Sequence, residues 1–162
     1  MSRFVDFAMR LLEGLIALML AVMVVLVFGN VVLRYGFDSG ITVSEEVSRW
    51  LFVWLTFMGA LVALRREEHL GSDFVVSRLG PRGRRACRVL GHLAMLGVCA
   101  ILLHGALAQV RINADVSAPV TGASVGLVYA AGVVFAVGAT VVLVAQLVRT
   151  LRHPAQAEED AP

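Results

Sequence analysis

The stretch Ile41–Asp73, ITVSEEVSRWLFVWLTFMGALVALRREEHLGSD, decides how this chain folds. Its centre, Trp50 to Leu64, carries no charge and would make a helix of roughly 22 Å at about 1.5 Å per residue. The hydrocarbon core of a bilayer is about 30 Å thick, so a membrane-spanning helix must begin earlier in the sequence. Ser44 is a favourable N-cap residue, and Glu45 and Glu46 would complement the positive end of the helix dipole. The sequence therefore predicts a span that starts near Ser44 and has charged residues at its entry.

The two acids at this entry have a basic partner within reach on the same helix. Arg49 lies four residues after Glu45 and three after Glu46, and both spacings favour an ion pair along one helix face. Arg34, which precedes the connecting loop, is a further candidate partner. Two interpretations remain open. Either the charges neutralise one another at headgroup depth, or they contact an extracytoplasmic partner or a neighbouring subunit.

The composition of the whole chain points to a membrane protein. Of its 162 residues, 59% are apolar, whereas soluble domains contain about 45–50%. We therefore expect an all-α integral membrane fold, with one membrane domain over residues 1–153. Its four transmembrane helices are predicted near residues 14–33, 44–64, 89–110 and 123–148. A short interfacial helix is predicted over residues 72–79, and the tail 154–162 is predicted to be disordered.

Short connections favour antiparallel neighbours in a four-helix arrangement. On the last predicted span, Gly132, Ala136 and Thr140 recur at a spacing of four residues. Small side chains at that spacing let helices approach closely in lipid. The pattern is weak evidence by itself, because alanine and glycine are abundant in this sequence.

The distribution of arginine predicts the orientation in the membrane. All 14 basic residues are arginines, and most of them lie in the N-terminal segment, in the connection 65–88 and after the last span. Cytoplasmic loops carry an excess of basic residues, so both termini are expected in the cytoplasm. Glu45, Glu46 and Arg49 would then lie at the outer face of the membrane.

The same stretch resembles the signature of a known family, the small membrane subunit of tripartite ATP-independent periplasmic (TRAP) transporters, also called the DctQ-like family. The matching residues are Ser44-Glu45-Glu46 and Arg49 at the entry, Leu51-Phe52-Val53-Trp54 and Phe57 in the aromatic run, and Ala63, Arg65 and His69 at the exit. The resemblance covers about 30 residues, and the predicted four-span layout agrees with it over the whole chain.

The resemblance implies an accessory subunit that packs against the scaffold of a large permease, while a periplasmic binding protein delivers an organic anion, often a carboxylate or a sugar acid. It marks six residues as motif residues and candidate partner contacts: Glu45, Glu46, Arg49, Trp54, Arg65 and His69. His69 has two interpretations, since it either organises the cytoplasmic loop or is simply exposed there. Membrane lipids are the other expected partners, and nothing suggests nucleic-acid binding.

The polar residues of the predicted spans do not suggest catalysis or a cofactor. His92 and His104 share one span, where a separation of 12 residues places them about 18 Å apart along the axis, so they cannot hold a haem between them. Glu13 precedes its apolar run and lies close to Arg10, unlike a proton-coupling carboxylate deep in the membrane. No cofactor, metal or enzymatic activity is therefore expected.

Three rival functions remain. As alternatives to a TRAP subunit, the chain could be the small subunit of a tripartite tricarboxylate transporter, a membrane anchor of a redox complex, or a self-sufficient small exporter. The EE-x-x-R entry and the RREEH exit argue against the first of these. The spans also lack the paired Pro/Gly-broken helices that usually mark a transporter's substrate site, which argues against the exporter.

Overall fold

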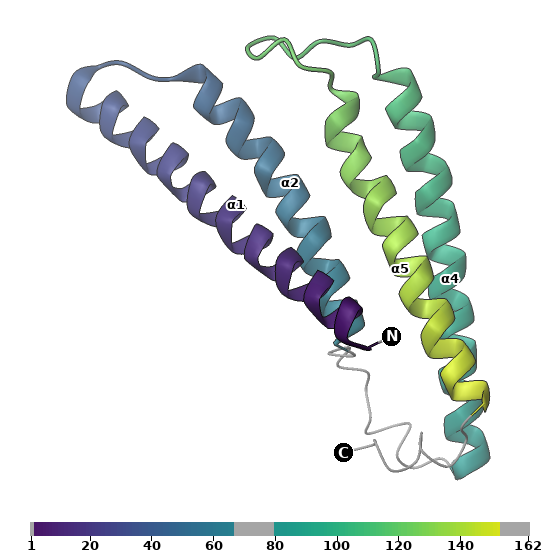
Figure 1. The fold of residues 1–162 in the computed structure, drawn as a ribbon. Helices are drawn as coiled ribbons and strands as arrows, with labels where there is room; N and C mark the ends of the chain where they lie inside the picture. Colours follow the sequence, from purple (N-terminus) through teal and green to yellow (C-terminus); the bar gives the residue numbers. More distant parts are fainter. Residues whose placement is uncertain (1, 67–79, 153–162) are drawn as a thin grey trace.

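The computed structural model describes residues 2–66 and 80–152, and these form four long α-helices (Figure 1). In chain order they are α1 (Ser2–Phe37), α2 (Thr42–Arg65), α4 (Pro81–Ile112) and α5 (Gly126–Arg152). All four are long and apolar enough to cross a membrane. The predicted all-α fold with four transmembrane helices is therefore confirmed. His69, the predicted helix 72–79 and the tail 154–162 lie outside the described residues.

The helices do not have the bounds of the predicted spans. The first three extend beyond the apolar runs at both ends, because a helix continues through polar residues that water and headgroups can solvate. The fourth begins later than residue 123. The segment before it forms a turn instead, in which the amide of Ala118 donates to the carbonyl of Ala123 at 2.8 Å and Gly122 has a φ of +70°. A positive φ suits glycine, which has no Cβ.

The start of α2 corrects one prediction. Ser44 is not the N-cap, because the helix begins at Thr42 after Ile41, which provides no side-chain cap. The hydroxyl of Ser44 instead donates to the carbonyl of Leu26 on α1 at 2.7 Å, and the amide of Ile41 donates to Asn30 Oδ1 at 2.7 Å. The polar groups at the start of α2 are therefore satisfied across the hairpin rather than within the helix.

The four helices pack as two antiparallel hairpins. α1 contacts α2, α4 contacts α5, and the hairpins meet where α2 packs against α5, so the helix order in space is α1, α2, α5, α4 (Figure 1). The start of α1 and the end of α5 lie at the same end of the molecule. At the opposite end the hairpin axes diverge in this view, and the loop between α4 and α5 extends toward the start of α2. The predicted antiparallel neighbours are present.

The core lies where α2, α4 and α5 meet. Leu64, Cys99, Ala139 and Leu143 form a buried apolar cluster there. The close approach depends on small residues: a Cβ added at Gly138 would lie only 2.8 Å from Leu61 Cδ2. Lipid tails are as apolar as these side chains, so tight packing rather than escape from water holds the helices together.

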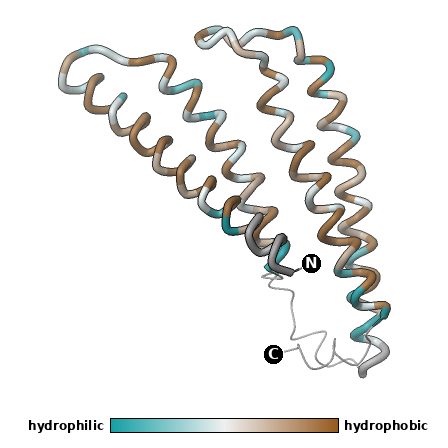
Figure 2. Tube along the Cα trace, viewed as in Figure 1, coloured by the Kyte–Doolittle hydropathy of each residue, from teal (hydrophilic) through white to brown (hydrophobic). Residues whose placement is uncertain are grey.

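α1 and α4 are the two end helices of the row, and α1 is the less buried of them. Only 6% of its most apolar window is buried within the chain, compared with 28% for α5. Figure 2 shows apolar residues along the middle of the helices and polar residues gathered toward their ends. An ion pair closes the first hairpin at the end that carries the N-terminus, with Glu13 Oε1 at 2.6 Å from Arg66 Nη2. Because so little of α1 is buried within the chain, its apolar outer face is available to lipid or to a partner protein.

Candidate functional site

The candidate site lies at the end of the helices that carries the α1–α2 connection. Its two acids, Glu45 and Glu46, are adjacent in the sequence but face different parts of the molecule, because neighbouring residues of a helix point in different directions. Glu45 faces α1 and Glu46 faces the loop between α4 and α5. The predicted acidic cluster is thus divided between two separate sets of contacts.

Glu46 links the two hairpins. Its carboxylate accepts hydrogen bonds from the amides of Val120 at 3.2 Å and Thr121 at 3.1 Å, and from the hydroxyl of Thr121. By surface area Glu46 is only 9% exposed. Hydrogen bonds to an ionised acceptor are stronger than neutral ones. One acid from the start of α2 therefore holds the loop that precedes α5.

Glu45 belongs to the first hairpin. It accepts a hydrogen bond from Asn30 Nδ2 at 3.2 Å and lies 3.7 Å from Arg34 Nη1. Participation of Arg34 was an expectation from the sequence, and it is confirmed. The expected close ion pair of Arg49 with the acids does not form among residues 2–66 and 80–152, although the charge of this exposed arginine acts on Glu46 at longer range. The neighbouring helix and loop engage the carboxylates instead.

Trp54 lies at the contact between the hairpins. Its indole Nε1 donates to the carbonyl of Leu127 on α5 at 3.1 Å, and one turn further on Phe57 stacks against Phe135 with ring centroids 5.6 Å apart. Arg65, the last residue of α2, makes contacts within the chain. Of the six motif residues, Trp54 thus faces α5, Glu46 faces the loop and Glu45 faces α1.

Asn30 and Ser48 are buried polar residues that the sequence motif did not include, and Ser44, which the motif did include, is buried beside them. Asn30 Oδ1 accepts from Ile41 while its amide nitrogen donates to Glu45, so one side chain connects α1, the loop and α2. The signal for Asn30 is its position as a lone amide in a long apolar run, where a polar side chain needs a partner. Ser48 gave no comparable signal.

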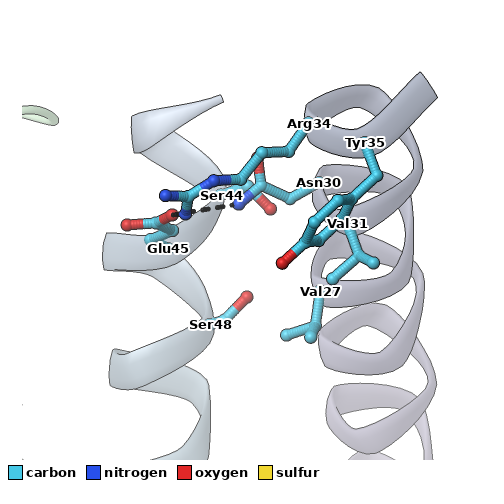
Figure 3. A pocket seen from close by; sticks show the side chains of 8 residues that line it. All are labelled: Val27, Asn30, Val31, Arg34, Tyr35, Ser44, Glu45 and Ser48. Atoms are coloured by element: carbon cyan, nitrogen blue, oxygen red, sulfur yellow. Dashed lines mark hydrogen bonds and ion pairs between the residues drawn. The ribbon is translucent and has the colours of Figure 1, made fainter. Parts of the chain in front are cut away.

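A pocket opens between α1 and α2 beside these residues, with a cavity volume of about 280 Å³. Figure 3 shows Arg34 and Asn30 reaching from α1 toward Glu45 on α2, with Ser48 lower on the same helix. The wall of the pocket contains the Arg34–Glu45 pair and, toward the middle of the span, Val27 and Val31. The arrangement can hold two helices together and can present polar groups to a ligand at the edge of a membrane.

Polar side chains nearer the middle of the spans are engaged locally. Thr56 donates to the carbonyl of Phe52 at 2.8 Å, and Thr140 donates to the carbonyl of Ala136 at 2.7 Å, in each case within one helix. His92 Nδ1 lies 2.7 Å from the carbonyl oxygen of Arg88 on its own helix. These groups satisfy the backbone of their own helices rather than converging on a common centre.

Comparisons with known proteins identify relatives over nearly the whole chain. Residues 23–153 match the model of a family described as tripartite ATP-independent periplasmic transporters, DctQ component. Two proteins of Haemophilus influenzae assigned as TRAP transporter small permeases are 37% and 35% identical. The first alignment covers 93% of this chain and 94% of that relative, and the second covers 79% and 78%. The C4-dicarboxylate TRAP transporter small permease DctQ of Vibrio cholerae is 30% identical over 64% of this chain and 45% of its own length.

Proposed function

Since the chain belongs to the DctQ family of TRAP transporter components, we propose that it acts as a scaffold subunit, which supports a large permease in the membrane while a periplasmic binding protein supplies an organic anion. It is a multi-pass inner-membrane protein. Relatives from Vibrio cholerae and Pseudomonas aeruginosa are named for C4-dicarboxylates, which supports an organic acid as the transported substrate. No catalytic role is proposed.

One observation supports the scaffold role above the others. The helices form an open row, and Thr56 and Thr140, on its two inner helices, bond within their own helices. A charged substrate in a membrane needs converging polar groups to replace its hydration. The row instead exposes large apolar side chains on its outer helices, such as Val25 at 69% and Ile101 at 76%. A surface of this kind suits a larger membrane protein or lipid.

The transport prediction is tested with the purified full-length chain in sealed vesicles under a sodium gradient. We expect no accumulation of labelled organic acid from the chain alone, because the polar pocket between α1 and α2 lies at one end of the helices and does not lead across the membrane. With the large permease and the binding protein added, accumulation is expected to depend on this chain. Accumulation by the chain alone would contradict the proposal, and so would full activity of the other two components without it.

We also propose that both termini face the cytoplasm, as the arginine distribution favours. Cys87 offers a test because it is exposed near the start of α4, while Cys99 is buried and acts as the internal control. A membrane-impermeant maleimide is expected to label Cys87 in inside-out vesicles but not in right-side-out vesicles. The opposite pattern would reverse the orientation. The Cys87→Ser variant identifies which thiol reacts.

A further inference from the structure

The pocket between α1 and α2 contains a buried polar atom without a partner. Ser48 is 7% exposed, and its Oγ has no hydrogen-bond partner within the described residues. In Figure 3 this hydroxyl points into the space between the two helices. Ser44, one turn earlier, has its hydroxyl engaged by Leu26. Buried polar groups are nearly always hydrogen-bonded, so the unpartnered hydroxyl of Ser48 points to a ligand that supplies the missing hydrogen bond.

The mouth of the same pocket presents one positive and one negative group. Arg34 Nη1 and Glu45 Oε1 lie 3.7 Å apart, with side chains 67% and 53% exposed. A guanidinium has five donors and a carboxylate about four acceptor positions, so both keep capacity for a ligand, even though Glu45 also accepts a hydrogen bond from Asn30. An anion alone would be attracted by Arg34 and repelled by Glu45. A ligand carrying both charges complements the pair.

The pocket also spans the depth at which a lipid changes from apolar to polar. Val27 and Val31 are 48% and 45% exposed on its apolar side, and Tyr35 is 85% exposed at its outer edge. From Val27 to Arg34 the rise along α1 is roughly 10 Å. The headgroup layer of a bilayer is about 5–8 Å thick on each side. Acyl chains lying along the valines would therefore place a headgroup beside Arg34 and Glu45.

We propose that this pocket binds a zwitterionic phospholipid bearing a primary ammonium, with its phosphate accepting from Arg34 and Ser48 and its ammonium donating to Glu45. The cavity of about 280 Å³ suits a headgroup rather than a whole lipid, since pockets for drug-sized ligands run from about 300 to 1,000 Å³. The bound lipid completes the polar end of the first hairpin. The site is independent of the transport role proposed above.

The test is native mass spectrometry of the full-length chain with phosphatidylethanolamine, phosphatidylcholine and phosphatidylglycerol of identical acyl chains. We expect phosphatidylethanolamine to bind most tightly. Arg34→Gln is expected to weaken it by about tenfold and Ser48→Ala by about fivefold, which is the range for the loss of one typical hydrogen bond. Arg10→Gln and Thr56→Val are the matched controls outside the pocket, and neither should change the affinity.

A change in lipid preference separates binding from a merely structural role. Glu45→Gln removes the charge that repels an anionic headgroup, so the preference for phosphatidylethanolamine over phosphatidylglycerol should shrink. Equal affinity of the wild-type chain for both lipids would overturn the proposal. So would unchanged binding in Arg34→Gln and Ser48→Ala, or displacement of the lipid by inorganic phosphate or by soluble glycerophosphoethanolamine. Loss of the lipid when the large permease binds would also contradict the proposal, because a side chain of the permease would then occupy the pocket in the assembled transporter.

Discussion

Replacement of Glu46 with alanine is expected to release the 113–125 loop from the start of α2. Three hydrogen bonds from Val120 and Thr121 lose their acceptor at once, and these bonds join the two hairpins at this end. The expected result is amide hydrogen exchange at Val120 and Thr121 that is faster by about tenfold or more, as for other segments that open locally. Exchange within the core of α5 should change much less, because Ala139 and Leu143 are packed elsewhere.

The control for Glu46→Ala is Asp115→Ala, which removes an exposed acid from the same loop. Glu46→Gln should fall between the two, since its amide oxygen still accepts but carries no charge. Unchanged exchange at Val120 and Thr121 in Glu46→Ala would contradict the role given to this carboxylate.

Reversing the charge of both acids, in Glu45→Lys with Glu46→Lys, should impair uptake by the assembled transporter without abolishing membrane insertion. The reason is that the two lysines would repel Arg34 and would leave Val120 and Thr121 without their acceptor. Wild-type uptake in that variant would mean that neither acid matters to the assembled transporter.

Truncation of Leu143 to alanine is expected to loosen the contact between the hairpins. Leu143 is 1% exposed and packs with Leu64, Cys99 and Ala139 at the meeting point of three helices. In a soluble protein a buried Leu→Ala change lowers the free energy of unfolding by about 2–5 kcal/mol. Part of that loss is the transfer free energy of the side chain from water to the protein interior. In a bilayer the alternative environment is already apolar, so mainly the loss of packing remains, and we expect about 1–3 kcal/mol.

The matched control is Val141→Ala on the same helix, where the side chain is 65% exposed to the surroundings. Its expected cost is below about 0.5 kcal/mol, as for substitutions away from packed sites. Unfolding of both variants by denaturing detergent, followed by circular dichroism, measures the difference in free energy. Similar values for Leu143→Ala and Val141→Ala would mean that the buried cluster does not join the hairpins.

Each of the four predicted spans overlaps one observed helix, because the length of apolar sequence that a bilayer requires can be read without knowing the neighbouring helices. The bounds of the helices differ from those of the spans. The resemblance drawn from the stretch around Glu45 and Arg65 was confirmed by the family match over residues 23–153. Gly132 and Ala136 do lie in a helix contact, with both buried on α5. The spacing of these small residues was weak evidence for a helix contact, because spacing alone does not show which neighbouring helix packs against that face.

Two local predictions were wrong for the same physical reason. Ser44 was expected to cap its own helix and Arg49 to pair along its own helix, since only intrahelical spacing can be read from a sequence. In the structure Ser44 bonds to Leu26, and the two acids bond to α1 and to the 113–125 loop. Partners that lie 15 or 74 residues away have no local signature.

Four apolar helices and a resemblance to TRAP small permeases could be predicted from the amino-acid sequence, because length, hydropathy and a short motif suffice for both. The arrangement of the helices as an open row of two hairpins became known only from the folded structure. The folded structure also showed that Glu46 holds a loop, and that Ser48 is left without a partner beside Arg34 and Glu45. The direction in which each polar side chain faces depends on which helix packs beside it, and that follows from packing between distant segments.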